Sequence, residues 1–255
     1  MPNKSTIKPT SSAIVLLSGG LDSTVSLWWA KTQQYKHIIA LTFQYGSKEE
    51  AILAELTKRI GNMAGIDNHE FITLDFLAKY SKLIDSSLAQ NSKVALPHLS
   101  SDELDELPQT RASAKSVWIP ARNLVFLSIA SALAETIGHK VDIITGFNLE
   151  EGTTFPDNSK EFIEHFNKTV ELGVLHAQVT VICPLVGLDK GEIIKVGEKL
   201  GVPFVFTSSC YNPLGFDEKN HPIHCGICES CLRRKRGFKK QAIPDPTIYQ
   251  KKKKT

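Results

Sequence analysis

The chain lacks the sequence features of several common protein classes. It contains neither the Gly-x-Gly-x-x-Gly dinucleotide motif nor the Gly-x-x-x-x-Gly-Lys-Ser/Thr phosphate loop. No apolar run approaches the ~18 residues that cross a bilayer, and residues 1–8 contain no apolar core of a secretory signal. We therefore expect a cytoplasmic protein without a membrane partner. The formal net charge of +3 is too small to indicate nucleic-acid binding by itself.

Cysteine is also scarce. The five cysteines are expected to be thiols or metal ligands rather than disulfides, because the cytoplasm is reducing. The chain has 255 residues, of which 42% are hydrophobic. This length and composition predict one large domain, or one domain with an appendage.

The most informative segment is Ser-Gly-Gly-Leu-Asp-Ser-Thr at residues 18–24, directly after the apolar run 13–17. The run is typical of a strand buried on both faces, and the glycine pair permits a tight turn. A helix is expected over about residues 23–32, with Asp22, Ser23 and Thr24 as candidate caps. A glycine-rich turn at a helix N-terminus predicts an anion site, since free N–H groups and the helix dipole favour negative charge.

Strand and helix patterns then alternate along the chain. Strands are predicted at 38–43, 70–74, 141–145 and 179–183, and helices at 48–64, 121–137, 159–172 and 189–200. Ser159 is the expected N-cap of one helix, and Asp189 with Glu192 forms a predicted capping box. Alternation of this kind predicts an α/β fold, with a parallel sheet and helices on both faces. The proline-containing, acidic region 75–117 is predicted to be an insertion or a mobile loop.

Four cysteines gather near the C-terminus. Cys225, Cys228 and Cys231 form two overlapping Cys-x-x-Cys units, and Cys210 lies upstream. Four thiolates complete a closed tetrahedral shell for a structural zinc ion. An iron–sulfur cluster, or His221 or His224 replacing one thiolate, remains an alternative. Cys183 lies in an apolar run and is expected to be buried and inert.

The order of the motifs resembles the 7-cyano-7-deazaguanine synthase family (QueC, or ExsB), within the pyrophosphate-loop ATP pyrophosphatase superfamily. The resemblance covers about residues 13 to 246. It rests on residues 16–26, 43–46, 119–124, 184–194 and 209–211 with the terminal Cys-x-x-Cys-x-x-Cys. The segment 146–159 departs from the family pattern but retains Pro156-Asp157. The resemblance implies a Rossmann-like sheet of the adenine nucleotide alpha hydrolase type, over residues 13–206. It further implies a zinc-binding segment at 207–246, and flexible tails are expected at 1–12 and 247–255.

Activity is likewise implied by the resemblance. Members of the family use ATP and ammonia to convert 7-carboxy-7-deazaguanine into 7-cyano-7-deazaguanine, for queuosine or archaeosine synthesis. The small-molecule partners are then ATP with Mg²⁺, ammonium and the deazapurine acid. No direct nucleic-acid partner is expected, and a homodimer is possible, with Trp28-Trp29 as interface or as core. The residues leave no room for a glutaminase domain, so free ammonium or a separate subunit is expected to supply the nitrogen.

Site residues follow from the same resemblance. The implied catalytic residues are Ser18, Asp22, Arg122 and Lys190. The implied substrate-binding residues are Arg122, Asn123 and Asp157, and the metal ligands are Cys210, Cys225, Cys228 and Cys231. The ATP-binding residues are Leu16, Leu17, Ser18, Gly19, Gly20, Leu21, Asp22, Ser23, Thr24, Val25, Ser26, Gln44, Tyr45 and Gly46.

Each assignment has a structural alternative. Asp22 either binds Mg²⁺ or caps the helix. For Arg122 and for Lys190, the alternative is a solvated side chain on the surface. Asp157 reads the guanine-like edge or simply occupies a turn. Two other functions also remain open. One is a pyrophosphate-loop enzyme that adenylates a tRNA base. The other is a zinc-ribbon nucleic-acid binder that uses the basic stretch 232–236 and the Lys251–Lys254 run.

Overall fold

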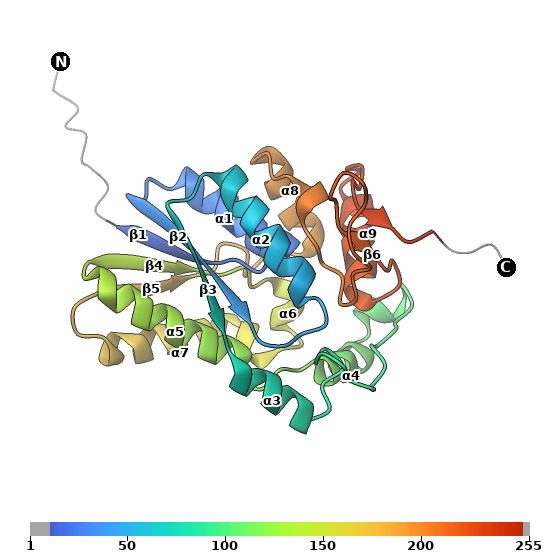
Figure 1. Ribbon diagram of the computed structural model, residues 1–255, viewed down its shortest axis with the longest axis horizontal. Helices are drawn as coiled ribbons and strands as arrows, with labels where there is room; N and C mark the ends of the chain where they lie inside the picture. The colour runs from blue at the N-terminus through green and yellow to red at the C-terminus, as the bar shows by residue number, and fades with distance from the viewer. Residues whose placement is uncertain (1–10, 252–255) are drawn as a thin grey trace, which may run out of the picture.

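The computed structural model describes residues 11–251. Its centre is a five-stranded, entirely parallel sheet in the order β3-β2-β1-β4-β5 (Figure 1). The strands are β1 (Ser12–Leu16), β2 (His37–Gln44), β3 (Asn68–Thr73), β4 (Lys140–Ile144) and β5 (Gln178–Ile182). The long helices are α1 (Leu21–Thr32), α2 (Glu50–Ala64), α3 (Asp75–Leu83), α4 (Leu107–Ser116), α5 (Arg122–Ile137), α7 (Lys160–Gly173), α8 (Lys190–Lys199) and α9 (Glu229–Lys240). The predicted α/β fold is confirmed, and each predicted strand and helix appears within a few residues of its expected bounds.

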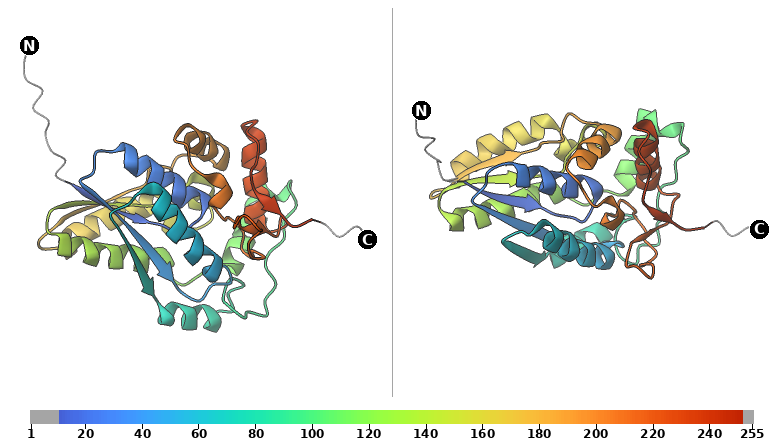
Figure 2. Two further views of the ribbon diagram at one scale, coloured as in Figure 1. Left: turned by 45° about the horizontal axis from the view of Figure 1, so that its top comes forward. Right: turned by 90° about the horizontal axis from the view of Figure 1, so that it is seen from above.

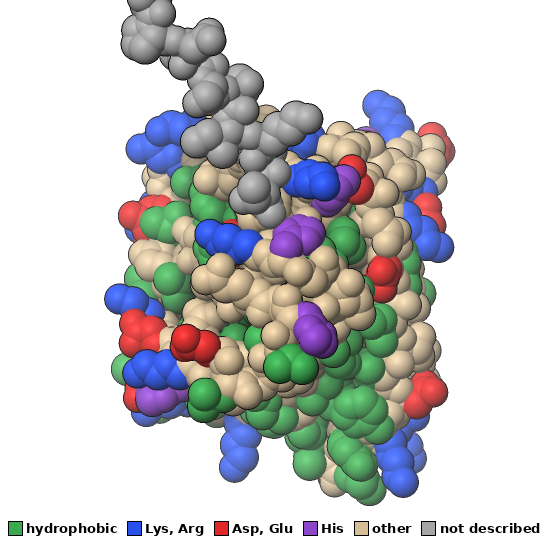
Figure 3. Space-filling model, turned by 90° about the vertical axis from the view of Figure 1, so that its left-hand side faces the viewer, with side chains coloured by type: hydrophobic (Ala, Val, Ile, Leu, Met, Phe, Trp, Pro, Cys, Tyr) green, Lys and Arg blue, Asp and Glu red, His purple; other side chains and the backbone are tan. Residues whose placement is uncertain are grey.

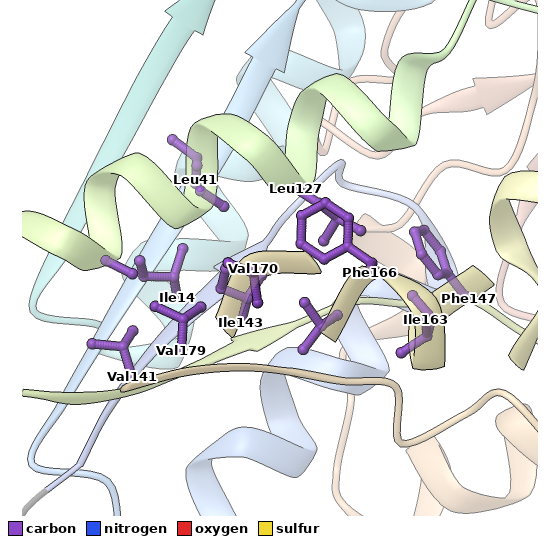
Figure 4. Packing of buried hydrophobic residues seen from close by; sticks show 13 residues of the cluster. Ile14, Leu41, Leu127, Val141, Ile143, Phe147, Ile163, Phe166, Val170 and Val179 are labelled. Atoms are coloured by element: carbon purple, nitrogen blue, oxygen red, sulfur yellow. The ribbon is translucent and has the colours of Figure 1, made fainter. Parts of the chain in front are cut away.

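One face of the sheet packs against α5 and α7. Ile14 of β1 lies in register with Ile39 of β2 and with Ile143 of β4, and Ile143 lies beside Val181 of β5. These branched side chains form a continuous apolar surface with Leu127 of α5. Figure 4 shows side chains from the strands and from both helices meeting in this layer.

The opposite face is covered by α1 and α2, as Figures 1 and 2 show. Ala13, Val15 and Ala40 point to this side and pack with Leu27 of α1 and Leu56 of α2. The helix α8 lies against α1 in turn, and α9 lies against α8. The C-terminal segment is thereby joined to the sheet through two helices. Trp28 and Trp29 are partly buried in this packing.

Short elements complete the molecule. They are α6 (Leu149–Gly152), three 3-10 turns at Glu103–Asp105, Pro156–Asn158 and Phe204–Phe206, and the two-stranded ribbon of β6 (Ile223–His224) and β7 (Ile248–Tyr249). Ser159 caps α7 through the N–H of Phe162, and the capping box of Asp189 and Glu192 is present. Over residues 11–251, no helix combines the length and hydropathy needed to cross a bilayer.

Two sequence-based predictions are wrong in part. Region 75–117 contains α3 and α4, and its Leu88, Val117 and Ile119 are buried against the cleft. The apolar side chains that bury this segment are scattered between polar residues. The proline and acidic content of the segment therefore made it look like a loop. In the predicted tails, Ser12 belongs to β1 and residues 248–249 form β7. Residues 1–10 and 252–255, which include most of the lysine run, lie outside the described residues.

Figure 3 views the molecule from the side opposite the C-terminal segment. Basic and acidic side chains are interspersed around this face, and hydrophobic side chains gather over its lower part. This face therefore does not carry a field of a single sign, which phosphate-backbone binding would require.

Candidate nucleotide and deazapurine site

A cleft of about 250 Å³ lies at the carboxyl ends of the central strands. The chain runs outward from β1 to β3 on one side and then from β4 to β5 on the other, so the topology reverses between β1 and β4. Ligands of open α/β sheets bind at this reversal, because the two following loops diverge and leave a crevice. Residues from the loops after β1, β2 and β4 line the cleft.

The loop after β1 forms one wall. Gly19 has a φ of +77°, in the left-handed region that favours glycine, and the chain enters α1 immediately afterwards. The predicted side-chain cap is wrong. Gly20 is the N-cap and, among the described residues, no side chain caps α1. The hydroxyls of Ser23 and Thr24 instead donate back to the carbonyl of Gly20. The first-turn N–H groups are thus left for an anionic ligand.

The predicted loop residues divide into two groups. Leu16, Leu17, Ser18, Gly20, Leu21, Asp22 and Ser23 line the cleft, with Gln44 and Tyr45 from the loop after β2. Thr24, Val25 and Ser26 are fully buried within α1, and Ser26 Oγ donates to the carbonyl of Thr145. Ser26 therefore ties α1 to the end of β4, whereas Val25 packs among Ile193 and Ile194 of α8. None of the three residues lines the cleft. Gly46 packs against Ala78.

Lys190 reaches the loop from the start of α8. Its Nζ lies 2.5 Å from Oδ2 of Asp22, and both side chains are largely buried. Burial lowers the pKa of Lys190, but the carboxylates of Asp22 and Glu151 outweigh it, so the pKa is raised and the ammonium stays charged. The solvated alternative for Lys190 is excluded. Asp22 Oδ1 is buried and, within the described part of the chain, has no hydrogen-bond partner.

Arg122 and Asp157 lie together on another wall. Ala121, at φ +50°, turns the chain into α5, and Arg122 follows with its guanidinium over the ring of Tyr45. Asp157 is buried and accepts a hydrogen bond from the N–H of Asn123. Burial lowers the pKa of Arg122, and the charges of Tyr45 and Asp157 raise it above its usual range. Burial raises the pKa of Asp157 despite the nearby guanidinium.

Several residues of the cleft were not predicted. The side chains of Trp118, Phe155 and Tyr211 add aromatic surface, and the rings of Trp118 and Phe155 are stacked with centroids 6.2 Å apart. Two glutamates, Glu49 and Glu151, also line the cleft. Sequence offered little signal for either, because a glutamate at the start of a helix is ordinarily solvated.

The four predicted metal ligands are brought together beside the cleft, which Cys210 also lines. The Sγ atoms of Cys210, Cys225, Cys228 and Cys231 all lie within 4.8 Å of one another. Such a set can bind one metal ion. Within the described residues neither histidine belongs to the set. His224 accepts from the N–H of Ser209, and His221 pairs with Asp217. Cys183 is apart, beside Thr145, and burial raises its pKa to about 11.

The basic stretch 232–236 lies in α9, and two of its arginines are held by partners within the protein. Arg234 is fully buried and donates to Thr207, Thr247 and the carbonyl of Phe204. Arg233 pairs with Glu150 and Glu229. These guanidiniums fasten the metal-binding segment to the rest of the protein and are not available to phosphates.

Replacing Arg234 with Met is expected to destabilise the protein by about 3 kcal/mol, because buried acceptors lose their donors. Thermal unfolding measures the effect. Arg234→Lys is not expected to rescue it, since an ammonium cannot reproduce the planar fork of donors. The matched control is Arg236→Met, whose partner Asp105 is mostly exposed. This change is expected to cost under about 1 kcal/mol. Equal losses in the two variants would contradict the anchoring role.

Three features define a nucleotide-binding α/β protein. They are the reversal of the sheet, the glycine turn that leads into α1, and the pair of Lys190 and Asp22. The protein also has a four-cysteine metal site. The chain belongs to the QueC family, since the family model described as "Queuosine biosynthesis protein QueC" matches residues 12–242.

Curated relatives agree with this assignment. The chain is 44% identical over 236 residues to the 7-cyano-7-deazaguanine synthase of Pyrococcus horikoshii, covering 92% of this chain and 96% of the relative. It is 41% identical over 242 residues to that of Methanococcus maripaludis strain S2, covering 93% and 98%. Among solved structures, the U34-tRNA thiolase NcsA from Methanococcus maripaludis, with its 4Fe-4S cluster, aligns at a TM-score of 0.46 and 15% identity. That alignment covers 94% of this chain and 75% of the thiolase, and carries no argument about function.

Proposed function

We propose that this protein is an ATP-dependent carbon–nitrogen ligase that converts 7-carboxy-7-deazaguanine and ammonia into 7-cyano-7-deazaguanine. The observation that carries the proposal is one cleft with two kinds of wall. One wall is the glycine turn before α1, a helix that no side chain caps among the described residues, and the other holds the half-buried Arg122 and the buried Asp157. The loop suits the phosphates of ATP, and the second wall suits a purine-like acid. Membership of the QueC family supports the same reaction.

The chemistry explains why ATP is needed. A carboxylate is a poor electrophile, since attack on it must expel oxide. Transfer of an adenylyl group from ATP turns that oxygen into part of a good leaving group, and pyrophosphate departs. Ammonia then forms the amide and releases AMP. A second adenylation, now of the amide oxygen, allows its loss and leaves the nitrile.

The walls of the cleft have distinct tasks in this scheme. Backbone N–H groups of Gly20 and Leu21, with the hydroxyls of Ser18 and Ser23, bind the β- and γ-phosphates. Gln44 and Tyr45 contact the adenosine. Lys190 offsets the negative charge that develops on the phosphates during transfer. Gly19, Thr24, Val25, Ser26 and Gly46 support the loops rather than touch ATP.

Arg122 is suited to hold the carboxylate of the deazapurine, because its planar guanidinium can donate two parallel hydrogen bonds. Asn123 holds Asp157 through its backbone and side chain. The Asp157 carboxylate then accepts from the N–H groups of the guanine-like edge. Trp118 and Phe155 provide flat apolar surface for the ring.

Asp22 fits a Mg²⁺ ligand. Its Oδ1 is a buried carboxylate oxygen without a hydrogen-bond partner among residues 11–251, and hard divalent cations prefer such oxygens. Bound Mg²⁺ would neutralise phosphate charge, while Lys190 and Asn148 hold the other oxygen, Oδ2, in place.

We further propose that the four-cysteine site holds one structural zinc ion. A tetrahedral ion with Zn–S bonds of about 2.3 Å places its ligand sulfurs about 3.8 Å apart, which accords with the mutual limit of 4.8 Å.

The site supports a division into a nucleotide-binding unit at 13–206 and a zinc-binding segment at 207–246. Because Arg233 and Arg234 of α9 are held by partners within the protein, we propose small-molecule substrates and no direct nucleic-acid partner. A cytoplasmic homodimer is our proposal for its state in the cell.

The test is mass spectrometry of reactions that contain the purified protein, Mg-ATP, ammonium and 7-carboxy-7-deazaguanine. We expect the nitrile mass, dependent on both ATP and ammonium, with an amide intermediate and AMP under single turnover. Absence of amide and AMP while nitrile forms would refute the two-step scheme. Absence of any product from folded, metal-loaded protein would refute the substrate.

Asp157→Asn is expected to raise the KM for the deazapurine acid by about tenfold or more, because a carboxylate hydrogen bond to the ring is lost. The KM for ATP should change little. Steady-state kinetics with each substrate varied in turn provide both values. Equal increases in the two constants would contradict the assignment of Asp157 to the deazapurine.

A further inference from the structure

Glu49 is a buried carboxyl group that takes no part in the proposed binding of ATP or of the deazapurine acid. It lines the cleft, with an exposed fraction of 7%. Its Oε2 is buried and lacks a hydrogen-bond partner among the described residues. A buried polar atom normally has a partner, since leaving it unpaired costs about 1–3 kcal/mol. The missing partner therefore points to a ligand that enters the cleft.

The neighbouring glutamate shows the contrast. Glu50 Oε2 accepts from the backbone N–H groups of Tyr45 and Gly46 and so fixes the turn after β2. Glu49 is the N-cap residue of α2, yet its side chain makes no capping hydrogen bond. Of the two adjacent carboxyl groups, Glu50 therefore serves the fold, whereas the Glu49 side chain neither caps the helix nor holds the turn.

We propose that Glu49 binds ammonium in the cleft and accepts its first proton, so that ammonia can attack the activated carboxyl carbon. This inference rests on the proposed function and adds the residue that prepares the nucleophile. Ammonium is a small cation with four N–H donors. It would donate a hydrogen bond to Oε2 and place a positive charge beside the carboxylate.

The surroundings favour proton transfer near neutral pH. The groups facing Glu49 are Tyr45 and Ser47 on the segment between β2 and α2, Glu50 at the start of α2, and Arg122 of α5. Burial raises the pKa of Glu49 to about 7, although Arg122 and the Ser47 hydroxyl act in the opposite direction. A general base is most effective when its pKa lies near the working pH. Arg122, proposed to hold the substrate carboxylate, keeps the acyl carbon and Glu49 in one part of the cleft.

The step balances without a further reactant. Ammonium gives one proton to Glu49 and becomes ammonia. The nitrogen lone pair forms a bond to the acyl carbon, the bond from that carbon to the AMP oxygen breaks, and AMP leaves with its electron pair. The second proton passes from nitrogen to the phosphate of AMP, which yields the neutral amide. Glu49 then returns its proton to water.

Glu49→Gln separates the two half-reactions. Exchange of pyrophosphate into ATP, dependent on 7-carboxy-7-deazaguanine, needs no ammonia and is expected to stay near the wild-type rate. Formation of the amide at pH 7 is expected to fall by about 10²-fold, the usual contribution of a general base. This deficit should shrink as the pH rises, because free ammonia then no longer needs the base. Glu49→Asp should retain part of the amide-forming rate.

The matched control is Glu55→Gln, which removes a partly exposed carboxylate from the same helix and should leave both half-reactions unchanged. Circular dichroism and metal content verify folding. A parallel fall in exchange and amide formation, a deficit independent of pH, or an unimpaired Glu49→Gln variant would each overturn the inference. Wild-type protein without exchange or product would instead refute the proposed function itself.

Discussion

Asp22→Ala is expected to abolish turnover almost completely, with a fall in kcat of about 10³-fold or more. The substitution removes the proposed Mg²⁺ ligand and also the partner of Lys190. Removal of one member of a buried ion pair costs about 3–5 kcal/mol, because the remaining charge is buried without compensation. Activity and thermal unfolding should therefore both suffer, and the assay above and calorimetry measure them.

The destabilisation of Asp22→Ala should depend on pH in a defined direction. Burial lowers the pKa of Lys190, and Asp22 is the largest of the charges that raise it. Without Asp22, the folded-state pKa of Lys190 is expected to fall below its unfolded value. Between these two pKa values the folded variant must release a proton that the unfolded chain keeps. This proton release lowers the free energy of unfolding of the variant. The stability difference from wild type should narrow as the pH rises toward about 10, the ordinary lysine range.

Two controls isolate the site. Asp75→Ala removes an exposed aspartate from the first turn of α3, the position that Asp22 occupies in α1. This change should leave activity and stability near wild-type values. Asp22→Asn keeps a hydrogen-bond acceptor but loses the charge, and should be inactive yet less destabilised than Asp22→Ala. Full activity in Asp22→Ala would refute the proposed role in ATP chemistry.

Loss of the metal has the second large expected effect. Cys228→Ser should release the ion and unfold the segment around α9, because structural zinc contributes about 10–16 kcal/mol in small zinc-finger peptides. Here α9 retains its packing on α8, so we expect a net loss of about 4 kcal/mol. This corresponds to a fall in Tm of about 10 °C. Turnover should fall too, since Ser208, Cys210 and Tyr211 line the cleft.

Metal analysis should find one zinc ion per wild-type chain and neither iron nor acid-labile sulfide. Cys183→Ser is the matched control. Its sulfur lies beside Thr145, outside the four-cysteine set, and a serine hydroxyl can keep that contact. This control should retain both metal and Tm. A Cys228→Ser protein with unchanged metal content and Tm would contradict the structural role of the site.

Sequence was sufficient for the frame of the molecule. The branched apolar runs, the glycine turn at 18–24 and the capping box at Asp189 are local patterns, and each produced the element expected of it. The Cys-x-x-Cys spacing placed three thiols within reach of one ion, and the fold brought Cys210 to them. These predictions succeeded because near neighbours in the chain determine strands, turns and closely spaced ligands.

Local patterns failed where burial depends on partners that are remote in the sequence. The stretch around Arg234 looks like a solvated helix face, yet Arg234 is fully buried among acceptors from residues 204, 207 and 247. The region 75–117 looked like a loop and instead closes one side of the cleft with buried apolar side chains. In both cases the deciding partners are remote in the sequence.

By itself, then, the sequence determined the parallel α/β frame, the glycine turn before α1 and the composition of the four-cysteine cluster. Only the tertiary structure decided that Lys190 pairs with Asp22 across 168 positions, and that a buried oxygen of Glu49 has no hydrogen-bond partner within the described part of the chain. The physical reason is that a charged side chain acquires its protonation and its role from the surroundings that desolvate or pair it. Those surroundings are assembled by packing between distant segments.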